Sequence, residues 1–139
     1  MTALLPDVHL ARKVLADQPF SALVGARLEV FEPGRAVLAL DIHQGLTQQN
    51  GFVHGGVLAY AADNAITFAA GTVLGPAVLT SGMTISYVRP ALGATLEADA
   101  TVVSGGRRQA VCRCDLLAVG DDGARTLCAV AQGSVLTTG

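Results

Sequence analysis

Residues 48–64 read QQNGFVHGGVLAYAADN and place a carboxylate, Asp63, in the middle of an alanine-rich apolar segment. A His-Gly-Gly triplet at 54–56 opens this segment, which stays rich in Ala, Leu, Ile and Phe until it reaches GTVLGP. Glycine and proline at that point are typical of a helix end. The pattern predicts one long central helix over residues 55–73.

Runs with strand character lie on both sides of this helix. Before it, GARLEVFEPGRAVLALDI places Glu-Pro-Gly between two β-rich runs and predicts a hairpin over 25–42. After it, turns rich in Gly and Pro separate four further runs, which predict an antiparallel meander. These runs are residues 77–88, 94–104, 108–119 and 125–137.

The N-terminal segment, residues 1–20, has apolar side chains at helical spacing over 6–18 and predicts a short amphipathic helix. Together these elements predict one α+β domain over 1–139, in which a curved antiparallel sheet of about six strands wraps the central helix. The length of 139 residues suits a single core.

Composition and charge exclude several classes. The formal net charge is −2 and there is no basic run, so nucleic-acid binding is not expected. The first residues carry Asp7 and lack the cationic start and long apolar run of a signal peptide, so a cytoplasmic location is expected. Residues 64–88 hold no charge, but Gly and Pro interrupt them; a buried helix followed by a buried strand is predicted, not a membrane span.

Three cysteines, Cys112, Cys114 and Cys128, form no C-x-x-C pair. The first two alternate as strand neighbours on one face, which suits reduced core residues. No metal site and no redox cofactor are therefore expected.

Asp63 is the most unusual residue of the central helix, because between residues 42 and 96 only Asp63 and Arg89 are formally charged. Asp63 is expected to be buried, at a cost of about 1–3 kcal/mol even when partly compensated. A structural interpretation is that it caps or cross-links the fold through Asn64, Thr67 or a backbone N–H. A functional interpretation is that it reacts with, or activates, a bound group.

The start of the same helix offers a complementary group. The first N–H groups of a helix have no intrahelical partner and lie at the positive end of its dipole, where they can hold an oxyanion. Taken alone, the two glycines are explained by a tight turn and His54 by a structural role. Gly55 and Asp63 are eight residues apart, about 12 Å along a helix, too far to act on one bond. Two copies with antiparallel helices about a two-fold axis would create two shared sites.

The motif QQNGFVHGG, followed by VLAYAADNAITFAAG and MTISYVRPALG, resembles the hotdog-fold acyl-CoA thioesterases of the phenylacetic-acid-degradation type. Their pattern is Asn-x-x-Gly-x-x-His-Gly-Gly, with Asp or Glu nine residues after the His; here Gln48 replaces the Asn. The likeness spans residues 25–136. It implies a hotdog fold and hydrolysis of an acyl-CoA by a homodimer, or by a dimer of dimers forming a homotetramer. Gln48 favours an aryl or arylacetyl group, and a medium-chain acyl group is the other candidate.

The resemblance also implies roles for individual residues. Asp63 would be the nucleophile or the general base, and the Gly55 N–H of the other subunit would polarise the thioester carbonyl. His54 would orient the loop or bond the acyl group, and Gln48 would position water or substrate. Thr67 would bond Asp63, or else its own i−4 carbonyl. The remaining expected contacts with the substrate are those of Asn50, Gly56, Thr80, Ser81 and, at the CoA phosphates, Arg89, Arg107 and Arg108.

Two other functions fit the same fold. A hotdog hydratase or dehydratase normally carries a His in a proline-rich HFPxxP-like loop, which this sequence lacks. An acyl-CoA-binding module without turnover would not need Asp63. Such a module often carries an extra DNA-binding segment, which the short N-terminal helix of this sequence does not resemble. For the thioesterase, no metal, nucleic-acid or membrane partner is expected.

Overall fold

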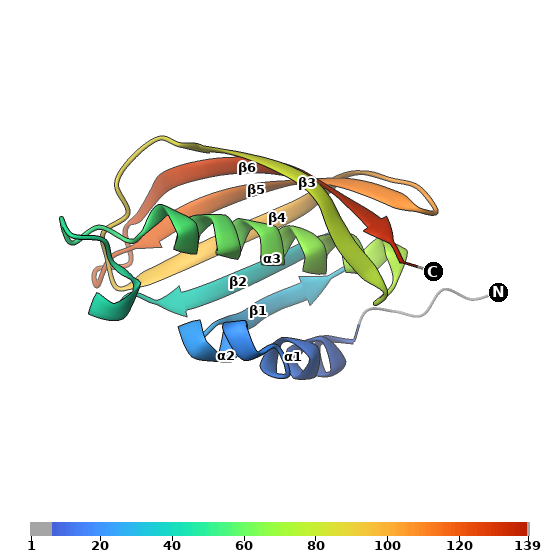
Figure 1. Cartoon of the computed structure of the whole chain (residues 1–139), viewed down its shortest axis with the longest axis horizontal. Coiled ribbons are helices and arrows are strands. Elements are labelled where there is room, and N and C mark those ends of the chain that lie inside the picture. Colours follow the sequence, from blue (N-terminus) through green and yellow to red (C-terminus); the bar gives the residue numbers. More distant parts are fainter. Residues whose placement is uncertain (1–6, 139) are drawn as a thin grey trace.

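The computed structural model describes residues 7–138 and confirms the α+β prediction: one long helix lies in the concave side of a six-stranded antiparallel sheet, the arrangement of a hotdog fold (Figure 1). Two short helices lie beside the sheet at its β1 edge. In chain order, the elements are α1 (Val8–Ala16), α2 (Pro19–Val24), β1 (Arg27–Glu32), β2 (Arg35–Asp41), the 3₁₀ helix η1 (Gln44–Leu46), α3 (Gly55–Leu74), β3 (Val78–Tyr87), β4 (Thr95–Gly105), β5 (Gln109–Val119) and β6 (Arg125–Thr137).

The core forms where α3 meets the sheet. Small alanines on the buried face of α3 let the helix lie close to the strands. The fully buried Ile66 packs against Gly133 of β6, where an added Cβ would lie only 3.4 Å from the Ile66 side chain. Helix α3 is long and apolar enough to cross a membrane by length and composition alone. In this structure its apolar face is the core of the domain. The buried residues of α3 are Leu58, Ala61, Ala62, Ala65, Ile66, Ala69 and Ala70.

The strand order is β1-β2-β4-β5-β6-β3, which corrects the predicted meander. Strands β4, β5 and β6 follow one another as expected, but β3 pairs with β6 and lies at the edge of the sheet. Only about two-thirds of consecutive strands are neighbours, and turn signals do not reveal the exceptions. The strand predicted to be buried after the central helix is therefore largely exposed in the protomer.

The N-terminal helices extend further than predicted. Asp7 caps α1 by accepting the His9 N–H at 2.9 Å, and the helix ends at Ala16. A second helix, α2, follows and reaches Val24, beyond the predicted segment. Its signals were present in the sequence, because Pro19 occupies its first turn and the left-handed Gly25 (φ 78°) caps its end.

A polar network fixes α2 against α3. The buried Ser21 hydroxyl lies 2.6 Å from Gln18 Oε1 and 2.5 Å from Tyr60 Oη. The Asn64 amide donates to Gln18, Ser21 and Tyr60 over 3.1–3.2 Å. The buried Ser21 hydroxyl therefore has its partners, as a buried polar group requires, and these partners are themselves only partly buried. The network holds α2 beside the turn of α3 that carries Asp63.

Candidate active site

The start of α3 leaves one backbone donor free. His54 is the N-cap, and its Nδ1 accepts the Gly56 N–H at 2.9 Å. The N–H groups of Val57 and Leu58 turn back to the His54 carbonyl, at 2.9 and 3.4 Å. Within residues 7–138, no acceptor meets the Gly55 N–H. This N–H lies at the positive end of the α3 dipole and can donate to an oxyanion.

The two glycines at this point have different reasons to be glycine. A Cβ on Gly56 would lie 3.0 Å from His54 Nδ1, so a larger residue there would press on the capping imidazole. A Cβ on Gly55 would meet only the Tyr87 ring, at the ordinary contact distance of 3.5 Å, and Gly55 has no left-handed φ. The protomer therefore does not require glycine at 55. Close approach of a ligand to the backbone would require it.

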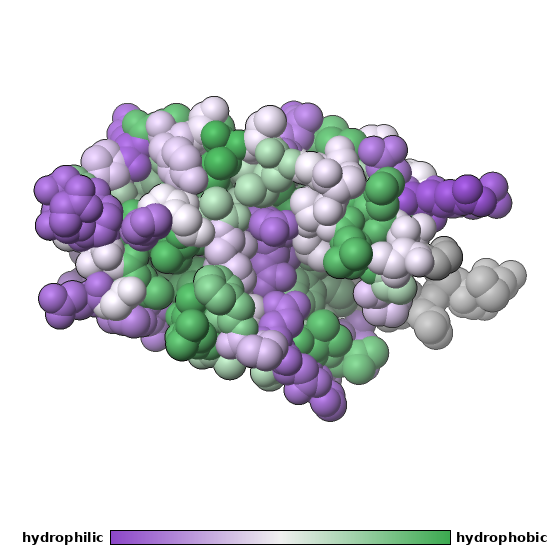
Figure 2. All heavy atoms as spheres, in the orientation of Figure 1, coloured by the Kyte–Doolittle hydropathy of each residue, from purple (hydrophilic) through white to green (hydrophobic). Residues whose placement is uncertain are grey.

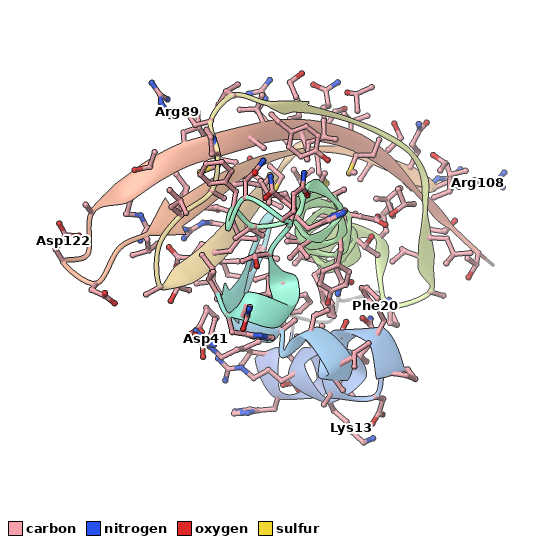
Figure 3. All side chains as sticks on the ribbon, turned by 60° about the vertical axis from the view of Figure 1, so that its left-hand side comes forward. Lys13, Phe20, Asp41, Arg89, Arg108 and Asp122 are labelled. Carbon is pink, nitrogen blue, oxygen red and sulfur yellow. The ribbon has the colours of Figure 1, made fainter. Side chains whose placement is uncertain are left out.

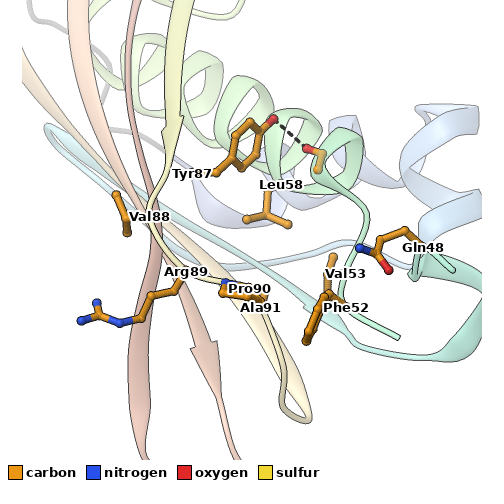
Figure 4. Close-up of a pocket in the computed structure, with 10 residues that line it drawn as sticks. Gln48, Phe52, Val53, Leu58, Tyr87, Val88, Arg89, Pro90 and Ala91 are labelled. Atoms are coloured by element: carbon orange, nitrogen blue, oxygen red, sulfur yellow. Dashed lines mark hydrogen bonds between the residues drawn. The ribbon is translucent and has the colours of Figure 1, made fainter. Parts of the chain in front are cut away.

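A pocket of about 350 Å³ opens beside Gly55 (Figure 4). The Gln48 side chain faces it and also shapes the loop, because its Oε1 accepts the Asn50 N–H. Asn50 itself is exposed and contributes its backbone to this turn. Most of the other lining is apolar. The lining residues are Gln48, Phe52, Val53, Gly55, Leu58, Tyr87, Val88, Arg89, Pro90 and Ala91.

Asp63 is exposed in the protomer, which corrects the expectation that it is buried. It lies on the side of α3 that the sheet does not cover. The Thr80 hydroxyl of β3 donates to Asp63 Oδ1 at 2.5 Å. Thr67 Oγ1 lies 2.8 Å from both the Asp63 carbonyl and Thr80 Oγ1, so Thr67 bonds its i−4 carbonyl and contacts the carboxylate only through Thr80. One carboxylate oxygen is thus held and Oδ2 is left for a ligand.

A β-bulge decides that Thr80, and not Ser81, meets Asp63. Between Thr80 and Gly82, β3 contains one residue more than its partner β6. Tyr87, Ile85 and Met83 pair with inward-facing positions of β6, and strict alternation would put Ser81 on the same inner face. The extra residue reverses the alternation, so that Thr80 faces α3. Ser81 instead donates to the Ser134 carbonyl at 3.1 Å.

The structure separates the three arginines expected at the CoA phosphates. Arg89 belongs to the rim of the first pocket, and its side chain points away from Gln48 and Phe52 (Figure 4). Arg107 and Arg108 line a second pocket of about 380 Å³ at the turn between β4 and β5, together with Ser104 and Gln109. Figure 3 shows Arg89 and Arg108 far apart on the sheet. One protomer therefore does not bring them to one ligand.

Comparison with known proteins assigns the family. The model of the thioesterase superfamily matches residues 50–124, a span that contains both Gly55 and Asp63. The chain belongs to the thioesterase superfamily. Relatives that match most of the chain support the same assignment.

A thioesterase family protein from Silicibacter pomeroyi is 31% identical, with a TM-score of 0.85 over 90% of this chain and 93% of that one. A variant of the phenylacetic acid degradation protein PaaI from Thermus thermophilus is 32% identical, with a TM-score of 0.75; the match covers 86% of this chain and 99% of that one. A curated Saccharolobus solfataricus protein, named as an esterase, is 28% identical over 129 residues, or 92% of this chain and 83% of that protein. This thioesterase-superfamily chain is therefore similar to hydrolases along most of its length.

The cysteines of this thioesterase-superfamily chain are poor nucleophiles. All three are buried and free. Burial raises the pKa of the Cys112 thiol to about 11, and it raises the pKa of Cys114 further, with help from Asp115 and Asp99. Within residues 7–138, no three His, Cys, Asp or Glu side chains gather as a metal site would need. Burial therefore keeps the Cys112 and Cys114 thiols in their neutral form, and a neutral thiol is a weak nucleophile.

Sequence reasoning missed Tyr87 at this site. Tyr87 lines the first pocket, and its hydroxyl donates to the Gly55 carbonyl at 2.9 Å. In the sequence it is one of several apolar positions in the strand run MTISYV, and no local spacing relates it to a loop more than thirty residues earlier. Only the pairing of β3 with β6 brings it there.

Proposed function

We propose that the protein hydrolyses an acyl-CoA thioester to the free acid and CoA, with Asp63 as the reacting carboxylate and the Gly55 N–H as the oxyanion donor. The observation that carries this proposal is the free Gly55 N–H at the edge of a mostly apolar pocket. Such a donor stabilises the negative charge that develops on the thioester oxygen and is typically worth about 2.7–4 kcal/mol.

Two routes for Asp63 lead to the same products. Its free Oδ2 attacks the thioester carbon, the C–S bond breaks, CoA leaves as the thiolate and takes a proton from solvent, and water then hydrolyses the acyl anhydride. Alternatively, Oδ2 removes a proton from water, which attacks the carbon directly and expels CoA. In both routes, Thr80 keeps Oδ1 occupied so that Oδ2 faces the substrate. Gln48, beside Gly55, would position water or substrate.

The site is complete only in a dimer. Eight helical residues separate Gly55 from Asp63, about 12 Å, and Asp63 is not part of the pocket at Gly55. In a dimer with antiparallel α3 helices, the Gly55 of one subunit would lie beside the Asp63 of the other. Two such sites would then be related by the two-fold axis.

Several features of β3 support this assembly. As an edge strand, β3 has a free side that can pair with a second strand. Leu79 on this strand is 66% exposed, and a Cβ on Gly82 or on Gly71 of α3 would meet nothing within 4 Å. Figure 2 shows hydrophobic patches around a hydrophilic centre on this face of the molecule. Exposed apolar surface and unexplained small residues are typical of an interface.

The dimer would also bring the arginines together. The β4–β5 turn lies near the C-terminal end of α3, since a Cβ on Gly105 would stand 3.3 Å from Val73. In an antiparallel pair, the C-terminal end of one α3 helix would lie toward the N-terminal end of the other, where the pocket at Gly55 opens. Arg107 and Arg108 could then hold the CoA phosphates at the mouth of that pocket, together with the partner's Arg89. The acyl group, aryl, arylacetyl or medium-chain, would enter between Phe52 and Leu58.

The test is CoA release from phenylacetyl-, benzoyl-, hexanoyl- and decanoyl-CoA by the wild type, Asp63→Asn and Asp121→Asn. Asp121 is exposed in the turn between β5 and β6 and serves as the matched control. We expect Asp63→Asn to lose about a hundredfold or more in kcat on every accepted substrate, with Asp121→Asn unchanged. Binding of these thioesters without CoA release by any of the proteins would replace the enzyme with a binding module.

A further inference from the structure

Two side chains hold the same peptide group at the start of α3. The peptide between Gly55 and Gly56 carries the Gly55 carbonyl and the Gly56 N–H. His54 Nδ1 accepts the N–H at 2.9 Å. Tyr87 Oη donates to the carbonyl at 2.9 Å, the bond dashed in Figure 4. Because a peptide group is planar, two bonds on its opposite edges fix its orientation.

This restraint matters because two consecutive glycines have no side chains to limit their backbone angles. The free Gly55 N–H belongs to the preceding peptide, which is joined to the held one at the Gly55 Cα. The Tyr87 ring also lies 3.5 Å from the point where a Cβ of residue 55 would stand, so the ring limits movement of the Gly55 backbone in that direction. Freedom at this point would let the N–H point away from a bound carbonyl.

We propose that Tyr87 is a positioning residue that holds the Gly55 N–H in the direction an oxyanion requires; this inference rests on the proposed thioester hydrolysis. A donor fixed before the reaction needs no reorganisation when the charge develops. Tyr87 is the last residue of β3, the strand whose Thr80 bonds Asp63. Strand β3 thus contacts both polar groups of the proposed site, the Asp63 carboxylate through Thr80 and the Gly55 peptide through Tyr87. A partner strand paired along β3 would stabilise both contacts.

A double-mutant cycle tests this role. Tyr87→Phe removes only the hydroxyl, and Gly55→Pro removes the N–H on which it acts. We expect Tyr87→Phe to lower kcat about fivefold, by the same factor for every acyl group and with KM unchanged. In the Gly55→Pro background, the same change should cause no further loss, since the donor it positions is gone. Tyr60→Phe, which loses a hydroxyl of the α2–α3 network, is the matched control and should cost the same factor in both backgrounds.

Two kinetic outcomes would overturn the proposal. A rise in KM with unchanged kcat would mean that the Tyr87 hydroxyl contacts the substrate directly. An equal loss in both backgrounds would mean that Tyr87 only supports the fold.

A second measurement does not depend on activity. In ¹⁵N-labelled protein, we expect the order parameters of the Gly55 and Gly56 amides to fall in Tyr87→Phe and to stay at wild-type values in Tyr60→Phe. Unchanged amides in Tyr87→Phe would disprove the positioning role even if the wild type released CoA. If the wild type releases no CoA but the amides loosen as expected, the proposed function fails while the restraint stands.

Discussion

The start and the middle of α3 carry the two polar groups of the proposed site, and they are held in different ways. At the start, His54 caps the helix from within its own turn and leaves the Gly55 N–H free beside a pocket. In the middle, Asp63 is exposed and is oriented by Thr80, seventeen residues away on β3. The first arrangement is mostly local, whereas the second depends on how the sheet is assembled.

This difference shows how the work of one site can be divided. The helix start has a pocket and a free donor. The middle of the helix carries Asp63, the carboxylate proposed to react, and Asp63 lines neither of the two pockets described above. Each region supplies what the other lacks, and the distance along the helix prevents one chain from combining them. The comparison therefore predicts that activity depends on both regions, taken from different subunits.

Removing the donor at the helix start should have the largest effect. We expect Gly55→Pro to lower kcat by about 10²–10³-fold, because it deletes one oxyanion N–H. Proline is tolerated at the first helical position, and His54 (φ −59°, ψ 134°) already has the extended conformation favoured before it. Gly55→Ala keeps the N–H and separates loss of the donor from loss of space. Steady-state kinetics and thermal unfolding of both variants would show whether the fold survives, and full activity in Gly55→Pro would remove the donor from the mechanism.

Mixing two inactive variants should restore part of the activity. A dimer of one Gly55→Pro chain and one Asp63→Asn chain contains one site with both groups intact, provided that the sites are shared between subunits. With random pairing, half of the dimers are mixed and each has one working site, so about a quarter of the wild-type activity should return. The measurement is CoA release after the two proteins are refolded together. Recovery no greater than the sum of the separate variants would mean that each chain builds its own site.

Loss of the hydroxyl that holds Asp63 should have the smallest effect of the three. We expect Thr80→Val to lower kcat about tenfold, because it removes a hydrogen bond to a charged group. Thr80→Ser should restore most of the activity, and Ser81→Ala should behave as wild type. A larger loss in Ser81→Ala than in Thr80→Val would contradict the orientation set by the bulge.

Much of the fold could be predicted because its signals are local. The Glu-Pro-Gly turn, the glycine and proline after residue 73 and the alternation around Cys112 and Cys114 each reflect backbone or burial preferences within a few residues. The place of β3 could not be predicted in this way. It depends on the pairing of β3 with β6, whose residues lie some fifty positions later in the chain, so no local signal reveals it.

The site divides along the same line. The sequence alone determined the long helix, its glycine start and the helical separation of Gly55 from Asp63, because helix geometry converts residue number directly into distance. Only the tertiary structure decided that Asp63 is exposed, that a bulge brings Thr80 and not Ser81 to it, and that Tyr87 reaches the Gly55 carbonyl. The exposure of Asp63 depends on which side of α3 the sheet covers. The contacts of Thr80 and Tyr87 depend on how the edge strand β3 pairs, because one extra residue in a strand reverses the direction of the side chains beyond it.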